Sequence, residues 1–312
     1  MICLARHFVS VTLAAGLALS LAPCAAHAQA PAPASPPASQ PLAQRIQPTD
    51  KTKFRPLTAV HAGAGNMAFV PILPRGAVTP YFNFLHRGEI PAGSGIGHHF
   101  HNTAEEMFVI LGGEAQFTVD GRTSVVKGPV AVVCKQGHSH AIYNSSGQTL
   151  QWMNWQVTAA PGISDAFDLG DPRVGVPLDP IPVFMTGPID RALVRPVADA
   201  PGVSSRRVFA PQVFTTVWAY VDHVLVAAGA STPAKPHDGI GEAYYVIAGA
   251  GSVKVGGETA PIKTGDAIPI RLGETSSFSS AGADPLELLV IGVAKDAEAK
   301  TALMSSAAPR RP

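Results

Sequence analysis

Apolar and polar residues alternate over short stretches of this chain, and residues such as Gly, Pro, Asn and Asp separate the stretches. A period of two predicts β-strands with one buried face, and the separating residues predict tight turns. Residues 114–127 are the clearest case, because two short alternating runs flank Asp120-Gly121, a strong β-hairpin signal. Helical periodicity is scarce. The pattern therefore predicts an all-β barrel or sandwich that begins near Phe54.

The same pattern occurs twice. A shift of 136 residues superposes the two halves at a constant offset, aligning Gly93 with Gly229, His101 with His237, Glu106 with Glu242, Gly113 with Gly249, Gly121 with Gly257 and Gly137 with Gly273. A fixed period with matched glycines indicates duplication of one structural unit. We therefore predict two tandem β-barrels joined by a Pro- and Gly-rich segment, which is long enough to pack on the barrels.

The first residues predict export. Arg6 and His7 precede an apolar run that closes on Ala26-His27-Ala28, as in a cleaved secretory signal peptide. Lipidation at Cys24 is the alternative. The protein is therefore expected to be periplasmic or secreted, without a membrane span. The predicted organisation is 1–28, signal peptide; 29–53, flexible Pro/Ala-rich segment; 54–157, N-terminal barrel; 158–203, connecting segment; 204–295, C-terminal barrel; and 296–312, tail.

Charge and cysteine content narrow the possible partners. The formal net charge is +1, and removal of 1–28 takes away only Arg6 among the charged residues, leaving 22 basic and 22 acidic side chains. A balanced chain without basic clusters argues against nucleic-acid or anionic-membrane binding. Of three cysteines only Cys134 lies outside the signal peptide, so no intramolecular disulfide is expected. With 46% hydrophobic residues, packing can stabilise the fold.

Metal-ligating side chains cluster in the first copy. His99 and His101 are two residues apart, so both imidazoles project from one face of a strand. Glu106 follows after a turn, and the apolar run behind it predicts the neighbouring strand. His140 supplies a third imidazole from further along the chain. Three imidazoles and one carboxylate suit a divalent transition ion such as Mn, Fe, Ni, Cu or Zn, and leave coordination positions open.

These spacings resemble the two sequence motifs of the cupin superfamily. Gly93, His99, His101, Glu106 and Gly113 match the first motif without a gap; the second is matched by Gly137, His140 and Asn144, with Lys135 at the family's usual proline. The resemblance implies a bicupin made of two antiparallel jelly-roll barrels. It also implies that the metal ligands are His99, His101, Glu106 and His140.

The second copy is predicted to be degenerate. Lys235 replaces His99, Ser276 replaces His140, and only His237 and Glu242 remain of the four ligand positions. Two ligands hold a catalytic ion poorly, and Lys235 would place a cation where the ion should lie. We therefore expect one metal ion per chain and a structural second barrel.

Beyond the ligands, the sequence offers weaker indications. His138 shares the parity of His140 and is the best candidate for proton transfer, although we favour a solvated rim histidine at this position. Tyr143, Trp152 and Asn154 could line the pocket mouth. Glu105 alternates with Glu106 and is expected to face solvent at the rim.

The family resemblance implies several functions. The first hypothesis is an exported metal-dependent oxidoreductase, of dioxygenase type, that acts on a small oxygenated organic molecule. The alternatives are a non-redox decarboxylase, lyase or isomerase, and a non-catalytic cupin that binds a metal or small molecule. The expected partner is a small molecule. The metal, the substrate and homo-oligomerisation stay open.

Overall fold

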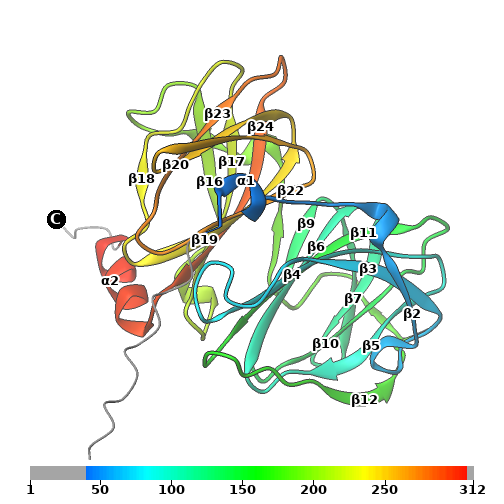
Figure 1. Cartoon of the computed structure of the whole chain (residues 1–312). Helices are drawn as coiled ribbons and strands as arrows, with labels where there is room; N and C mark the ends of the chain where they lie inside the picture. Colours follow the sequence, from blue (N-terminus) through cyan, green and yellow to red (C-terminus); the bar gives the residue numbers. More distant parts are fainter. Residues whose placement is uncertain (1–39, 308–312) are drawn as a thin grey trace, which may run out of the picture. The chain divides into compact units, whose positions relative to one another are not determined.

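Strands account for most of the fold in the computed structural model, which describes residues 40–307 (Figure 1). The predicted signal peptide lies outside these residues. Among the described residues, no helix has the length and apolar character needed to cross a membrane. The first barrel contains β2 (Arg55–Thr58), β3 (Asn66–Leu73), β4 (Phe82–Ile90), β5 (Gly95–Phe100), β6 (Ala104–Gly112), β7 (Glu114–Val119), β8 (Arg122–Lys127), β9 (Val130–Cys134), β10 (Ser139–Tyr143) and β11 (Leu150–Thr158).

The second barrel repeats these strands at the predicted offset. Of the eight strands from β4 to β11, seven begin 136 residues before their counterparts among β17 to β24, as Phe82 of β4 and Trp218 of β17 do; the exception is β5, whose counterpart is β18. The duplication and the all-β fold are therefore confirmed. The second barrel contains β16 (Val203–Phe209), β17 (Trp218–Val226), β18 (Lys235–Pro236), β19 (Ile240–Ala248), β20 (Ala250–Val255), β21 (Glu258–Lys263), β22 (Asp266–Ile270), β23 (Thr275–Ser280) and β24 (Leu286–Ala294).

Each barrel consists of two sheets. In the first barrel their strand orders are β14-β9-β6-β11-β4-β3-β2 and β12-β5-β10-β7-β8-β13. In the second they are β1-β22-β19-β24-β17-β16-β15 and β18-β23-β20-β21. Nearly all pairings are antiparallel, as expected of jelly rolls. The short added strands are β1 (Gln47–Pro48), β12 (Phe167–Asp171), β13 (Leu178–Asp179), β14 (Thr186–Pro188) and β15 (Arg195–Pro196).

Three hydrophobic cores stabilise this arrangement. One fills the first barrel and includes Phe108 and Trp152. A second fills the other barrel, around Phe278. The third lies between the barrels, where Trp155 of β11 and Trp218 of β17 belong to one buried cluster. The central strands of the larger sheet of each barrel are therefore buried on both faces, and β6 is buried continuously from Ala104 to Ile110 instead of alternating.

The segments outside the barrels are more ordered than the sequence pattern suggested. From Gln40 onward the predicted flexible segment 29–53 forms α1 (Leu42–Arg45), β1 and the 3-10 turn η1 (Lys51–Lys53). Leu42 is buried in the core of the second barrel, and β1 pairs with β22. An apolar anchor and a strand pairing fix this otherwise polar stretch.

The connecting segment 158–203 packs on the barrels, as predicted. Its strands β12, β13 and β14 extend sheets of the first barrel by pairing with β5, β8 and β9. The predicted tail 296–312 contains α2 (Ala297–Ala307). Within α2, the buried ammonium of Lys300 donates hydrogen bonds to the carbonyl oxygens of Phe214, at 2.7 Å, and Thr216, at 2.5 Å.

The prediction that Glu105 faces solvent at the rim is wrong. Its side chain is fully buried between the barrels. The carboxylate accepts hydrogen bonds from the backbone N–H and the hydroxyl group of both Thr215 and Thr216, at 2.5 to 3.0 Å. Strand alternation correctly predicted that Glu105 and Glu106 point to opposite faces of the sheet. The face that carries Glu105, however, packs against the second barrel and not against water. Four donors offset the desolvation of this charge.

Glu105→Gln is expected to lower the free energy of unfolding by roughly 2–4 kcal/mol, because the neutral amide brings N–H donors to four existing donors. Denaturant titration of the metal-loaded protein measures the change. The control is Glu114→Gln on the exposed end of β7, which should change stability by less than about 0.5 kcal/mol. Equal stabilities for the two variants would contradict an anchoring role for Glu105.

Candidate metal centre

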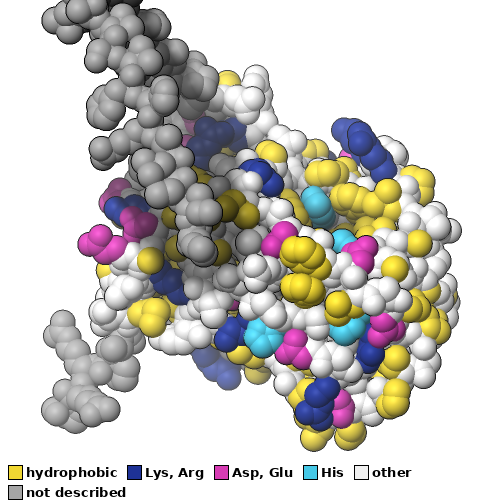
Figure 2. Space-filling view, turned by 90° about the horizontal axis from the view of Figure 1, so that it is seen from below, with side chains coloured by type: hydrophobic (Ala, Val, Ile, Leu, Met, Phe, Trp, Pro, Cys, Tyr) yellow, Lys and Arg dark blue, Asp and Glu magenta, His cyan; other side chains and the backbone are white. Residues whose placement is uncertain are grey.

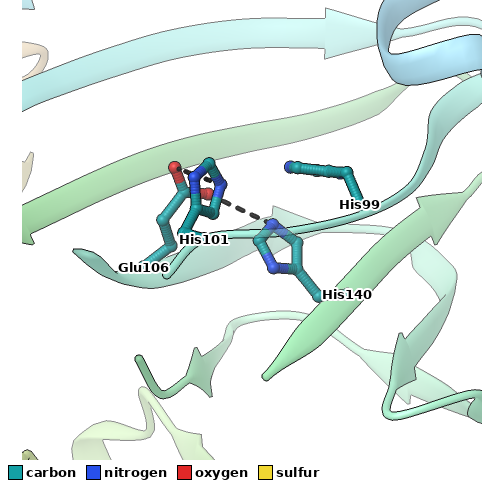
Figure 3. Close-up of side chains that lie close together, drawn as sticks. All are labelled: His99, His101, Glu106 and His140. Atoms are coloured by element: carbon teal, nitrogen blue, oxygen red, sulfur yellow. Dashed lines mark ion pairs between the residues drawn. The ribbon is translucent and has the colours of Figure 1, made fainter. Parts of the chain in front are cut away.

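The four predicted ligands come together inside the first barrel (Figure 3). His99 lies on β5, His140 lies opposite it on β10, and Glu106 lies on β6 in the other sheet. His101 follows the end of β5. One ligand atom from each residue lies within 4.8 Å of all the others, and all four side chains are buried. Figure 3 shows the three imidazoles and the carboxylate turned toward one another.

Hydrogen bonds orient two of the imidazoles. His99 Nδ1 lies 2.8 Å from the carbonyl oxygen of Gly97, and His101 Nδ1 contacts the carbonyl oxygen of Asp165. A carbonyl oxygen only accepts, so each Nδ1 carries the proton and each Nε2 presents a lone pair. This is the arrangement typical of metal-bound histidines, whose second nitrogen is held by a protein acceptor.

Buried ligand atoms without hydrogen-bond partners indicate that a metal fits here. His101 Nε2 lies 3.3 Å from Glu106 Oε1, and His140 Nε2 lies 3.2 Å from Glu106 Oε2. Neither Nε2 atom makes a hydrogen bond of good geometry within the described chain. Buried nitrogens are rarely left in this state. A divalent ion with borderline-soft character would satisfy these nitrogens and the carboxylate together.

Electrostatics favour the protonation states that bind a metal. Burial lowers the pKa of His99, and the nearby His140 lowers it further. Burial also lowers the pKa of His140, against the opposing effect of Glu106. For Glu106 burial raises the pKa, but the imidazoles of His101 and His140 lower it more, so its pKa falls below the usual range. Neutral imidazoles and an ionised carboxylate are ready to coordinate at neutral pH.

Two amide side chains hold the carboxylate of Glu106. Asn154 Nδ2 donates to Oε2 at 3.0 Å, and Gln156 Nε2 donates to Oε1 at 2.6 Å. Gln156 is in turn fixed through its Oε1 by donors from Asn83 and Ser164. Asn154 is one of the residues predicted at the pocket mouth, whereas Gln156 was not predicted. The available signal was their spacing of two residues, which places both on one face of β11.

The connecting segment completes the site. Asp165 Oδ1 accepts hydrogen bonds from the backbone N–H groups of Asn102 and Thr103, and so fixes the turn behind His101. Asp168 Oδ1 lies 2.6 Å from His61 Nδ1, and the His61 ring stacks on His99 with centroids 3.7 Å apart. These residues carry no motif. Their roles depend on tertiary contacts that sequence spacing does not encode.

A cavity of about 400 Å³ opens onto three of the four ligands. His86 lies in it stacked on Phe84, with ring centroids 3.9 Å apart, and burial lowers the pKa of His86 to about 4. On the face shown in Figure 2, histidine side chains lie beside both hydrophobic and charged ones. The described lining residues include no Lys or Arg; they are Leu57, Val60, His61, Met67, Phe69, Phe84, His86, Ile96, His99, His101, Glu106, Phe108, Trp152, Asn154, Gln156, Ser164, Asp165 and Ala166.

His138 is not among these lining residues. It precedes the first residue of β10, so strand alternation does not govern its direction, and its Nδ1 lies 2.6 Å from Asp120 Oδ2. Its side chain is about half exposed. The structure thus does not bring the proposed proton-transfer residue to the cavity. His61 and His86 occupy that environment instead. Tyr143 also lies outside the lining, whereas Trp152 and Asn154 belong to it.

The second barrel has a different arrangement at the equivalent positions. Lys235 Nζ donates to Glu242 Oε1 at 2.7 Å, so an ammonium group balances the carboxylate. His237 Nε2 lies 2.9 Å from the hydroxyl oxygen of Ser276. Within the described residues, only the first barrel groups three or more side chains able to hold a metal.

Comparison with known families agrees with the duplicated fold. The model of the "Cupin domain" family matches residues 86–156 and again residues 222–292, two spans separated by the 136-residue offset of the repeat. This chain is a cupin with two cupin domains. The match includes Glu106 and His140 in the first domain and Lys235, Glu242 and Ser276 in the second.

Several known proteins resemble this cupin. An oxalate-binding protein of Thermotoga maritima is 26% identical over 97 residues, which cover 31% of this chain and 80% of that protein. The salicylate 1,2-dioxygenase of Pseudoaminobacter salicylatoxidans, with gentisate adducts, superposes with a TM-score of 0.59 at 16% identity, covering 72% of this chain and 71% of the other. The coconut allergen cocosin gives 0.58 at 10% identity, covering 80% and 84%. The superpositions on these two structures establish a shared fold, and at such low sequence identity they establish the fold alone.

We expect one tightly held transition-metal ion per chain, because the second barrel lacks a full ligand set. His101→Ala and Glu106→Gln should each lose most of the ion after dialysis against a chelator, since each weakens direct coordination. His237→Ala is the matched control and should retain it. Elemental analysis of the dialysed proteins gives the stoichiometry. Two chelator-resistant ions per chain, or loss of the ion from His237→Ala alone, would contradict the assignment.

Proposed function

We propose that this cupin is a metal-dependent oxidoreductase of dioxygenase type that acts on a small oxygenated organic molecule. The observation that carries the proposal is the buried group of three imidazoles and one carboxylate at the end of an aromatic-walled cavity. The fold shared with a salicylate 1,2-dioxygenase supports it. When bound, a redox-active divalent ion would supply positions for substrate and dioxygen and would relay electrons from the substrate to dioxygen.

The residues of the chain have separable tasks in this proposal. His99, His101, Glu106 and His140 would hold the ion. Asn154 and Gln156 fix the carboxylate, and thereby limit the positions it can take during a reaction. The apolar walls, which include Phe108 and Trp152, would limit the access of water to the ligand end of the cavity.

The charge of the cavity narrows the range of substrates that the site can bind. A divalent ion and the Glu106 carboxylate together leave one net positive charge, enough for one phenolate or enolate. The described lining has no Lys or Arg to balance a further anion. Burying an unbalanced carboxylate is costly. A neutral diphenol or enediol, which loses one proton on binding, is therefore the substrate class that we favour.

A non-catalytic binding role is the second candidate. The likeness to an oxalate-binding protein, which covers 80% of that protein, favours it. A third candidate is non-redox decarboxylation, elimination or isomerisation at the same ion, which would serve as a Lewis acid. Oxygen consumption distinguishes the first function from the other two, and turnover without oxygen distinguishes the third from the second.

The test is oxygen uptake by protein reconstituted separately with Fe, Mn, Cu, Ni or Zn. We expect consumption with at least one metal, and a preference for hydroquinone over its carboxylated counterpart gentisate of at least about tenfold in kcat/KM. His101→Ala should be inactive and His237→Ala active. Oxygen-independent turnover would favour the non-redox alternative, and binding without turnover would favour the binding role.

We also propose that the protein is exported. The support is the sequence of residues 1–28, with a basic start, an apolar run and a small-residue cleavage pattern. Export agrees with a mature chain that has a single cysteine and no need of a disulfide. Residues 1–28 lie outside the part of the chain that the structure describes.

Expression from its own first codon in a Gram-negative host should yield periplasmic protein whose intact mass starts at Gln29. Ala28→Leu should block cleavage at this position, because the cleavage site requires a small residue. A lipid-modified chain that begins at Cys24 would support the lipoprotein alternative. Retention of the complete chain in the cytoplasm would contradict export.

A further inference from the structure

The second barrel has kept an internal cavity after losing the metal ligands. Its volume is about 400 Å³, equal to that of the cavity in the first barrel. Many lining positions correspond at the 136-residue offset, including Glu106 with Glu242 and His99 with Lys235. The lining residues are Val197, Val203, Ser205, Asp222, Val224, Thr232, Pro233, Ala234, Lys235, Pro236, Glu242, Tyr244, Ser276, Phe278, Leu288 and Val290. A barrel retained only as a scaffold would be expected to fill this space with side chains.

A complete hydrogen-bond network takes the place of the ion. Glu242 accepts from the hydroxyl groups of Tyr220, at 2.6 Å, and Tyr244, at 2.5 Å, and from the Lys235 ammonium, at 2.7 Å. The carboxylate is buried, and these three donors compensate for its desolvation. The second cavity therefore has a preformed polar end that needs no metal.

The Lys235 ammonium has one hydrogen-bond donor that its two contacts within the barrel do not use. Its ammonium carries three N–H groups, of which one reaches Glu242 and another reaches the Tyr220 hydroxyl at 3.1 Å. No third acceptor lies within hydrogen-bond distance among the described residues. The Lys235 side chain is about half exposed while it lines the cavity. One N–H group is thus available to a ligand that enters.

The charges around the cavity are balanced in pairs. Glu242 is neutralised by Lys235, and Asp222, which also lines the cavity, is paired with Arg207 at 2.5 Å. An anionic ligand would add an uncompensated charge beside two carboxylates. The rest of the wall is largely aliphatic or aromatic, with Val224, Phe278 and similar side chains. These features select an uncharged apolar molecule with a hydrogen-bond acceptor.

We propose that the second barrel is a metal-free binding site for a small, uncharged, apolar molecule with a carbonyl oxygen, which accepts a hydrogen bond from Lys235. Apolar walls provide the affinity, and the ammonium selects the carbonyl group. The lysine acts as a hydrogen-bond donor through its ammonium group, which the ion pair with Glu242 holds in place. This site is independent of the reaction proposed for the first barrel.

Calorimetric titration of the full-length metal-loaded protein tests the proposal with two probes of similar shape. Acetophenone carries the carbonyl oxygen, and ethylbenzene lacks it. We expect one acetophenone site per chain and about tenfold weaker binding of ethylbenzene. Benzoate, the anionic counterpart, should bind more weakly than acetophenone. Absence of acetophenone binding, equal affinities for acetophenone and ethylbenzene, or tighter binding of benzoate would overturn the proposal.

Variants locate the site. Lys235→Met should remove the preference for acetophenone, and Lys235→Arg, which keeps the donors, should preserve it. Val224→Phe should fill the second cavity and abolish binding, whereas Val60→Phe, on the wall of the first cavity, should leave acetophenone affinity within about twofold. Thermal unfolding verifies that each variant is folded. Loss of binding in Val60→Phe with retention in Val224→Phe would place the probe in the first barrel and reject the proposal.

Discussion

Two adjacent carboxylates on β6 face opposite sides of one sheet, and the architecture depends on the partners that stabilise each buried charge. Glu106 faces the interior of the first barrel, beside three imidazoles and two amide donors. Glu105 faces the second barrel and is held by Thr215 and Thr216. Both carboxylate side chains are buried. A shift of one residue in the register of β6 would exchange the two environments, so both sets of partners specify the same register.

Sequence spacing was sufficient for the features that repeat or follow a motif. The constant offset predicted two copies of one unit, and the strands obey it. The spacing of His99, His101, Glu106 and His140 predicted residues that do gather in space. These predictions worked because strand alternation and turn glycines are local properties. They determine which face a side chain occupies without knowledge of the partner sheet.

The remaining features depend on contacts between distant segments. Alternation assigns Glu105 to the outer face, but cannot show that a second barrel covers this face. Asp165 and Asp168 lie in a segment without a pattern, and reach the metal centre only because β12 pairs with β5. His138 lies outside the cavity with a half-exposed side chain, as the rim interpretation expects, because β10 begins one residue later and strand alternation does not set its direction. In each case a tertiary contact or an element boundary decided the outcome.

The pairing of β1 with β22 constrains the order in which this chain can fold. Gln47 lies opposite Ala267, so the start of the described chain is built into a sheet completed near its end. Closing a loop of this length costs more conformational entropy than forming any neighbouring hairpin, and the recipient strand must already be in place. If the chain emerges from a translocon N-terminus first, residues 42–48 can dock only after the second barrel has formed. Their docking is then a late step in folding, which requires the rest of the molecule to be complete.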